Sequence, residues 1–334
     1  TNPSAAGDRF INTTSGELFV ATDVTAGENV WKGQLGTDVE PPKYFGARAV
    51  NGGGYTGSQS NVIDYYTIAT TGDATDFGNL SVARSLLGAC SNGTRGIFGG
   101  GSTGSNSDVI DYITTSTTSN ATDFGNLTAA RRNQPCGNSN GTRGLFGGGH
   151  ISAQSDIIDY VNIASTGNAS DFGDLLSPGR TGGASYGNGT RGCWHAGHNG
   201  TANINVIEYV NMASTGNASD FGDATAARGS GLGGCSDGTK GLAAGGYISA
   251  ESNIIDYVNI ASTGNAQDFG DLTVSRYAPS GVSNGPRGTF AGGGNGGYQD
   301  EVDYVTIASL GNATDFGDIT VSRDAGAATS GDAS

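Results

Sequence analysis

Two columns of charged side chains recur along most of the chain and are the first candidates for chemistry. Acidic residues stand before a tyrosine at Asp64, Asp111, Asp159, Glu208, Asp256 and Asp303, and arginines recur at Arg84, Arg131, Arg180, Arg228, Arg276 and Arg323. These charges could form an ionic site, but a residue present in every repeat serves what every repeat needs. We therefore expect the arginines to pair with carboxylates and loop carbonyls in the interior, because an unpaired buried charge is costly.

A second repeated element is the tripeptide Asp-Phe-Gly, which matches the metal-binding motif of protein kinases. The sequence has no kinase glycine-rich loop, lysine or catalytic loop around it, so the match is coincidental. The tripeptide phenylalanines and the tyrosines of the acidic column are predicted core residues: Phe77, Phe124, Phe172, Phe221, Phe269 and Phe316, with Tyr65, Tyr112, Tyr160, Tyr209, Tyr257 and Tyr304.

The three histidines, His150, His195 and His198, lie in one part of the sequence. A metal site there is an open alternative, but their spacing matches no zinc motif, so no metal ligand is assigned. The sequence shows no set of nucleophile, base and orienting residue. We predict no catalytic residue, no cofactor and no enzymatic activity, although propellers do host enzymes and a fold alone excludes none.

These residues must be positioned by a repeat of 47 to 49 residues that runs from about Tyr44 to the C-terminus. Such a period indicates a solenoid, propeller or array. Each repeat predicts four strands. In the second repeat the first is Leu86–Cys90, an Asn92-Gly93 type I′ turn follows, and the second is Arg95–Gly99. The third is Val62 to Ile68 and its copies, and the fourth carries Asp-Phe-Gly.

The order of these motifs resembles the kelch repeat: a strand ending in glycines, an acidic residue before tyrosine, an aromatic about a dozen residues on, and a closing arginine. Phenylalanine stands where kelch repeats usually carry tryptophan, and the glycines are often three. The resemblance covers residues 44–334 and implies an all-β fold, a β-propeller with one four-stranded blade per repeat.

Six blades are expected, with both chain ends in one of them. The first repeat starts with a predicted second strand, Tyr44–Arg48, and the last stops near Gly331. Residues 323–331 would then supply the first strand of the blade formed by residues 44–83. Closure of this kind removes open sheet edges.

Residues 1–42 lie outside the repeat. Arg9–Asn12 and Glu17–Ala21 predict a β-hairpin with Trp31 as its core, and Pro41-Pro42 marks a linker before the propeller of residues 43–334. The amino-acid sequence of this segment resembles those of short β modules in bacteriophage tail fibres and related virion proteins. That resemblance implies attachment to other virion proteins through residues 1–42.

Composition narrows the range of partners. The net charge is −15, which argues against binding nucleic acid through a basic surface, and no apolar run is long enough for membrane insertion. The four cysteines fall in different repeats, and we expect free buried thiols, as in proteins that fold in a reducing cytosol. The chain has no signal peptide and no initiator Met, and is expected to be a processed product or a fragment.

The positions that differ between repeats are the candidates for recognition. The loop between the second and third strands varies most, at residues 54–61, 101–108, 149–156, 198–205, 246–253 and 294–301. Strand alternation places these loops on the face that carries the connections between blades. The candidate ligand-binding residues are Tyr55, His150, Trp194, His195, His198, Tyr247 and Tyr298, whose rings suit sugar or protein contacts. The alternative interpretation is that these loop sequences diverged without any role in binding.

Three functions remain open. The first is a non-enzymatic structural or adhesion protein of a bacteriophage particle (tail fibre, tail tip or capsid surface), located in the virion and made in the host cytoplasm. It would contact a host-surface glycan or protein, and it could form a homo-oligomer within the virion. The second is a bacterial lectin-like carbohydrate-binding propeller, extracellular or at the cell surface. The third is a propeller enzyme.

Overall fold

The computed structural model describes residues 9–11, 18–23, 30–33, 45–132, 136–176 and 178–332. The chain divides into two compact units, Thr1–Lys43 and Tyr44–Ser334. The described residues form strands and turns and contain no helix, so this part of the chain offers no helix that could cross a membrane.

The first unit contains a three-stranded antiparallel sheet in the order β1 (Arg9–Ile11), β2 (Leu18–Asp23) and β3 (Val30–Gly33). Arg9 pairs with Val20 and Ile11 with Leu18, in the hairpin register. The predicted turn between β1 and β2 and the side chain of Trp31 lie outside the described residues.

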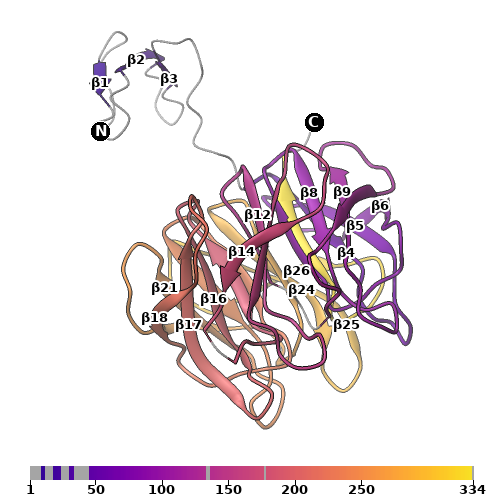
Figure 1. Ribbon diagram of the computed structural model, residues 1–334. Helices are drawn as coiled ribbons and strands as arrows, with labels where there is room; N and C mark the ends of the chain where they lie inside the picture. The colour runs from indigo at the N-terminus through magenta and orange to yellow at the C-terminus, as the bar shows by residue number, and fades with distance from the viewer. Residues whose placement is uncertain are drawn as a thin grey trace. The chain divides into compact units, whose positions relative to one another are not determined.

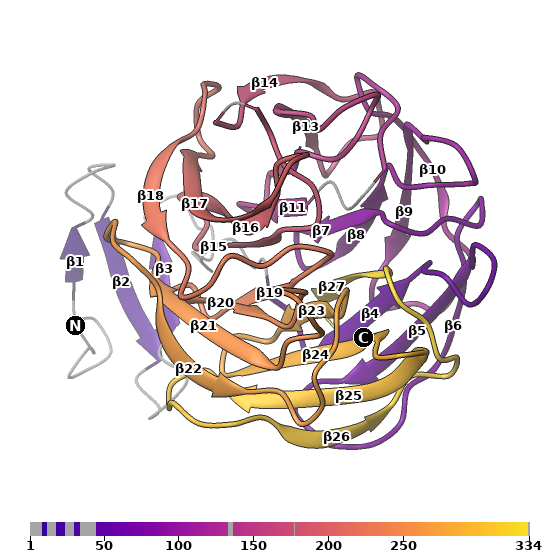
Figure 2. The same cartoon turned by 90° about the horizontal axis from the view of Figure 1, so that it is seen from below.

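The second unit is a six-bladed β-propeller (Figure 1). Its blades, numbered I to VI, are the four-stranded sheets β27-β4-β5-β6, β7–β10, β11–β14, β15–β18, β19–β22 and β23–β26. Figure 2 shows the first strand of each blade at the centre and the fourth at the periphery. The first strands are β27 (Ala327–Gly331), β7 (Gly88–Ser91), β11 (Cys136–Ser139), β15 (Ala184–Gly187), β19 (Gly233–Ser236) and β23 (Ser280–Ser283).

The other three strands of each blade follow the sequence columns. The second strands, which begin at a basic residue, are β4 (Arg48–Gly52), β8 (Arg95–Gly99), β12 (Arg143–Gly147), β16 (Arg191–His198), β20 (Lys240–Ala244) and β24 (Arg287–Gly294). The third strands are β5 (Val62–Thr67), β9 (Val109–Thr114), β13 (Ile157–Asn162), β17 (Asn203–Asn211), β21 (Ile254–Asn259) and β25 (Tyr298–Thr306). The fourth strands are β6 (Thr75–Asn79), β10 (Thr122–Asn126), β14 (Ser170–Asp174), β18 (Ser219–Asp223), β22 (Gln267–Asp271) and β26 (Thr314–Asp318).

The ring closes in blade I as predicted, because β27 pairs with β4 in the register Gly331 to Arg48 and Ala327 to Gly52. The prediction that Tyr44–Arg48 forms the second strand of this blade was wrong. That strand is Arg48–Gly52, and it begins at the basic column as in every other blade. Gly46 lies beyond the end of the ladder, where a Cβ atom would come within 1.9 Å of the Gly331 backbone.

The turn at Asn92-Gly93 also differs from the prediction. Type I′ requires positive φ at both central residues, but here Gly93 has φ 86° and Asn92 does not share that conformation. The side chain of Asn92 stabilises the turn instead, since its Oδ1 accepts hydrogen bonds from the backbone N–H groups of Thr94 and Arg95.

Asp-Phe-Gly forms a β-bulge, which explains why it recurs. In blade I, Asp76 pairs with Asp64 and Gly78 with Ile63, so Phe77 is the extra residue on its strand and is buried. Gly78 has φ 143°, and a Cβ atom there would lie 2.4 Å from the carbonyl oxygen of Ser119 in the next blade. The glycine is therefore required by the close approach of the neighbouring loop.

Each blade interface is filled by its own hydrophobic cluster. Between blades I and II, for example, Val50, Ile63 and Phe77 pack with Phe98 and Ile113. Five similar clusters fill the remaining interfaces. The phenylalanine column is buried in these clusters, as predicted. The tyrosine column is only half-buried, with each ring edge-on to the phenylalanine of its own blade.

The arginine column ties neighbouring blades together, which confirms its predicted structural role, and the basic residues that begin the second strands add further contacts between blades. The arginine that follows each fourth strand is buried and pairs with the acidic residue on the third strand of the next blade, as Arg84 does with Asp111 at 2.6 Å and Arg323 with Asp64 at 2.6 Å. The basic residue at the start of each second strand lies over a tyrosine ring of its own blade, at 4.2–5.7 Å from the ring centroid. It donates to a backbone carbonyl just after the third strand of the next blade, as Arg48 does to Thr115.

Three of the four cysteines, Cys90, Cys193 and Cys235, are free and buried, as predicted. Burial raises the pKa of the Cys193 thiol to about 12, and it raises the pKa values of the other two as well. The side chain of Cys136 lies outside the described residues.

Candidate functional site

The face of the propeller that carries the variable loops is built around a ring of paired positions, which we name the crown. Each pair joins the residue that follows a buried arginine to a residue at the end of a neighbouring glycine run, through an isolated β-bridge. The pairs are Asp324 with Tyr55, Ser85 with Ser102, Arg132 with His150, Thr181 with His198, Gly229 with Tyr247, and Tyr277 with Gly294. This arrangement confirms that the variable loops share a face with the connections between blades.

The crown surrounds a floor of strained backbone. Leu86, Ser230, Ala278 and Ala325 all have φ between 51° and 59°, the left-handed region that side chains rarely adopt. In this conformation their backbone groups reach sideways: Leu86 N–H donates to the carbonyl of Ala325, and Ala325 N–H to that of Ala278. The connections of successive blades are thereby hydrogen-bonded to one another around the axis, and this offsets the strain.

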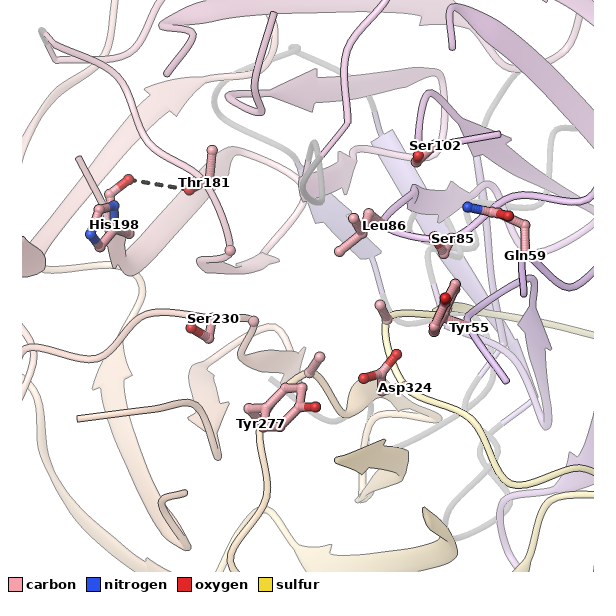
Figure 3. Close-up of a pocket in the computed structure, with 14 residues that line it drawn as sticks. Tyr55, Gln59, Ser85, Leu86, Ser102, Thr181, His198, Ser230, Tyr277 and Asp324 are labelled. Atoms are coloured by element: carbon pink, nitrogen blue, oxygen red, sulfur yellow. Dashed lines mark hydrogen bonds between the residues drawn. The ribbon is translucent and has the colours of Figure 1, made fainter. Parts of the chain in front are cut away.

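A cavity of about 600 Å³ lies within the crown and above this floor (Figure 3). Its walls include Tyr55, Tyr277 and Asp324 on one side and Thr181 and His198 on the other. The volume falls in the range of about 300–1,000 Å³ that is typical of small-molecule sites. Among the described residues that line it, none is a lysine or an arginine.

The polar groups of the cavity are held in fixed orientations. The Tyr277 hydroxyl lies near the carboxylate of Asp324, and the two side chains point toward one another in Figure 3. Burial raises the pKa of Asp324, and the nearby Tyr277 hydroxyl opposes that rise. Across the cavity, Nδ1 of His198 accepts a hydrogen bond from Gly200 N–H at 3.0 Å, which leaves Nε2 to carry the proton of the neutral ring.

The structure places five of the seven candidate residues on this face. Tyr55 and His198 line the cavity, and Tyr298 contacts Tyr55 edge-to-face at a centroid distance of 5.8 Å. His150 and Tyr247 belong to the crown but do not line the cavity.

Trp194 and His195 do not belong to this face, and their assignment as contact residues was wrong. Both have 0% exposed surface. Trp194 occupies the position of Phe98 and Phe146 on the second strand, so it packs between blades, where a Cβ atom on Gly147 would lie 2.6 Å from its ring. His195 follows it on the opposite side of the strand and points into the next blade interface.

Two of the six variable loops are shorter than predicted. In blade IV the ladder of β16 and β17 continues to the pair His198–Asn203, and in blade VI the ladder of β24 and β25 continues to Gly294–Tyr298. Residues 198–205 and 294–301 are thus partly strand. A bulge at Ala196, with φ 55°, lets the longer ladder of blade IV bend.

The residues that follow the buried arginines, among them Tyr277 and Asp324, were not predicted as site residues. A sign of them was present, because this position differs in every repeat (Ser85, Arg132, Thr181, Gly229, Tyr277 and Asp324) beside an arginine that never changes. The residues predicted from the loops after the glycine runs include one member of four crown pairs: Tyr55, His150, His198 and Tyr247.

The structure also brings together a series of polar groups that the sequence did not reveal. Tyr186 hydroxyl lies 2.8 Å from Nδ1 of His195, whose Nε2 lies 3.2 Å from Asp256, and Asp256 also pairs with Arg228. The pKa of Asp256 stays below its ordinary range because His195 and Arg228 outweigh the opposing effect of burial. All four side chains are buried, so the series connects blades IV and V and does not face the cavity.

Comparison with known proteins adds no further assignment. No protein-family model matches this sequence, and no curated protein matches it.

Proposed function

We propose that this chain is a non-enzymatic recognition protein of a bacteriophage particle, with kelch-like repeats, and that its crown contacts the host surface. The observation that carries the proposal is the contrast between the two kinds of position. The buried arginine–carboxylate pairs that join blades recur around the ring, whereas each crown pair is different. Loops held on a rigid scaffold are where binding residues usually lie, and the crown encloses the cavity.

The phage assignment rests on the resemblance of residues 1–42 to virion modules, through which the chain would join other virion proteins. The proposal is tested by labelling particles from the source with antibody fragments raised against residues 44–334. We expect labelling at regular positions on the virion, and slower adsorption to host cells when the antibody fragment covers the crown. Label confined to the bacterial cell surface would overturn the phage assignment.

A second experiment tests the choice of face. The triple replacement His150→Ala, His198→Ala and Tyr247→Ala changes three half-buried or exposed crown residues and should weaken host binding while the fold is retained. The matched control is Thr94→Ala, Thr142→Ala and Thr190→Ala, at exposed positions in the Asn-Gly turns. Loss of binding in the control alone would show that the opposite face is used.

The second candidate is a bacterial lectin-like propeller that is not part of a virion. It is favoured by the tyrosines and the carboxylate that face the cavity. Binding of glycans by the isolated protein, without any label on particles, would support it in preference to the phage protein. Turnover of a sugar substrate would instead support an enzyme.

A further inference from the structure

The corner of the crown between blades VI and I differs from the rest in its chemistry. It combines the carboxylate of Asp324 with the rings of Tyr55 and Tyr277, and Tyr298 braces Tyr55 from outside the cavity. Tyr298 is 39% exposed, so one aromatic edge of the corner remains open to solvent. No other described pair of the crown joins an acidic residue to an aromatic one.

The backbone fixes the position of this carboxylate. Tyr55 N–H donates to the carbonyl of Asp324 at 2.8 Å, and Asp324 N–H donates to the carbonyl of Tyr55. The nearby Tyr277 hydroxyl favours one orientation of the carboxylate before any ligand arrives. A carboxylate has about four lone-pair positions, so acceptor positions remain for a ligand in the cavity that Asp324 lines.

The charge of the corner selects among ligands. Asp324 is the only acidic residue among the described residues that line the cavity, and the lining contains no lysine or arginine to balance it. The one basic residue of the crown, Arg132, lies in a pair that does not line the cavity. An anionic ligand would meet an uncompensated negative charge, whereas the hydroxyl groups of a neutral ligand would donate to it.

We propose that this corner binds one residue of a neutral sugar, with Asp324 accepting hydrogen bonds from two adjacent hydroxyl groups and a tyrosine ring covering the apolar face of the sugar. Across the cavity, the Nε2–H group of His198 donates to an oxygen of the same glycan. The inference deepens the proposed recognition function and rests on it, since it names the ligand class of the crown.

The experiment titrates the full-length protein with methyl glycosides of neutral hexoses and, as the charged counterpart, with methyl glucuronide, by calorimetry or NMR. We expect neutral glycosides to bind and the glucuronide to bind at least tenfold more weakly. Asp324→Asn should weaken binding by about tenfold to a hundredfold, as expected for a hydrogen bond to a charged group. Tyr277→Phe should weaken it by a smaller factor, because it only releases the orientation of the carboxylate.

Tyr160→Phe is the matched control, since it also removes a tyrosine hydroxyl, but from the half-buried tyrosine column and not from the crown or the cavity lining, and it should bind like the parent. Unchanged thermal unfolding of each variant shows that the fold is retained. Equal binding of neutral sugars by Asp324→Asn and the parent would overturn the subsite. A different outcome would separate the two proposals. If the parent binds host cells, if no neutral glycoside competes with that binding, and if Asp324→Asn binds cells equally well, then the sugar subsite is wrong while the recognition function stands. If the parent binds neither cells nor glycosides, the proposed function fails with it.

Discussion

The interface between blades IV and V predicts a strong energetic coupling between His195 and Ala243. In blades II and III the aromatic of the second strand packs against a glycine of the preceding blade: a Cβ atom on Gly52 or Gly99 would lie 2.8–2.9 Å from the ring of Phe98 or Phe146. In blade V the aromatic is replaced by Ala243, and the facing glycine is replaced by His195. Ala243 pairs across the ladder with Asp256, the residue that His195 contacts. The two replacements are therefore complementary.

The cost of each single change follows from these contacts. His195→Gly leaves the buried hydroxyl of Tyr186 without its partner, which costs about 1–3 kcal/mol, and it opens a cavity, so we expect a total loss of about 3–5 kcal/mol. Asp256 retains Arg228 and the hydroxyl of Thr225. Ala243→Phe alone drives a ring into the imidazole and should cost about 1–3 kcal/mol.

The double variant restores the arrangement of the interfaces between blades I and II and between blades II and III, because the phenylalanine ring fills the space of the imidazole. We expect it to lose only about 1–3 kcal/mol, chiefly from the Tyr186 hydroxyl, where simple addition of the single losses gives about 4–8 kcal/mol. The difference, a coupling of about 3–5 kcal/mol, lies at or above the upper end of the range for residues in contact. In blade II the position equivalent to Tyr186 is occupied by Cys90. Adding Tyr186→Cys to the double variant should therefore recover more of the lost stability.

The assay is urea-induced unfolding of the four proteins of the cycle, followed by circular dichroism. Ala243→Phe combined with His150→Ala, a distant histidine, is the control and should be additive within about 0.5 kcal/mol. A double variant that loses as much as the sum of its parts would refute the idea that His195 occupies the space of an absent aromatic.

Three further predictions concern the ring as a whole. Deletion of residues 327–334 removes β27 and should strongly lower the thermal unfolding temperature; a temperature equal to that of the intact chain would contradict closure by this strand. Arg84→Met leaves Asp111 buried without its cation and should cost about 3–5 kcal/mol in unfolding experiments, whereas combining it with Asp111→Leu should restore part of that loss; an equal or larger loss in the double variant would contradict the pairing. The pKa of Asp256 is lowered in the fold, so its stabilising contribution is present above its ordinary pKa of 3.8 and is lost as the pH falls below that value. The difference in unfolding free energy between parent and Asp256→Asn should therefore shrink from pH 6 to pH 3, and a constant difference would show that the lowered pKa is not coupled to folding.

The propeller could be predicted because its determinants repeat. A column such as Arg84 and its five copies is visible by comparing the sequence with itself, and its partner Asp111 is visible in the same way. The closing strand could be predicted because the first repeat lacks a first strand and the last repeat ends after one. One error arose because Tyr44–Arg48 resembles the second-strand pattern, whereas the strand itself begins at Arg48. The other arose because the Asn92 side chain, rather than a positive φ at Asn92, stabilises the turn.

The site was predicted less well, because a single sequence does not show whether an unusual residue faces solvent or another blade. His195 and His198 are three residues apart, but only His198 reaches the loop face. Asp324 was overlooked because it lies in a connection between blades, outside the loops that vary most in length and composition. Its neighbour Tyr277 lies 47 positions earlier in the chain, on the other side of blade VI, and only the fold brings the two side chains together.

These cases separate two kinds of departure from the repeat. His195 differs from the glycine at the equivalent position of other blades, and it lies inside a blade interface. Ala243, in the facing blade, differs from the usual aromatic residue, so the two changes together keep the interface packed. Tyr277 and Asp324 also differ from the residues at the equivalent positions of other repeats, but they lie at the crown. There they replace no contact that recurs between blades, and their side chains line a cavity. A departure matched by another across an interface is explained by packing alone. Packing does not explain a difference that opens onto the cavity, and for that reason the proposed recognition function should be tested first at the crown rather than at β16, the strand that holds Trp194 and His195.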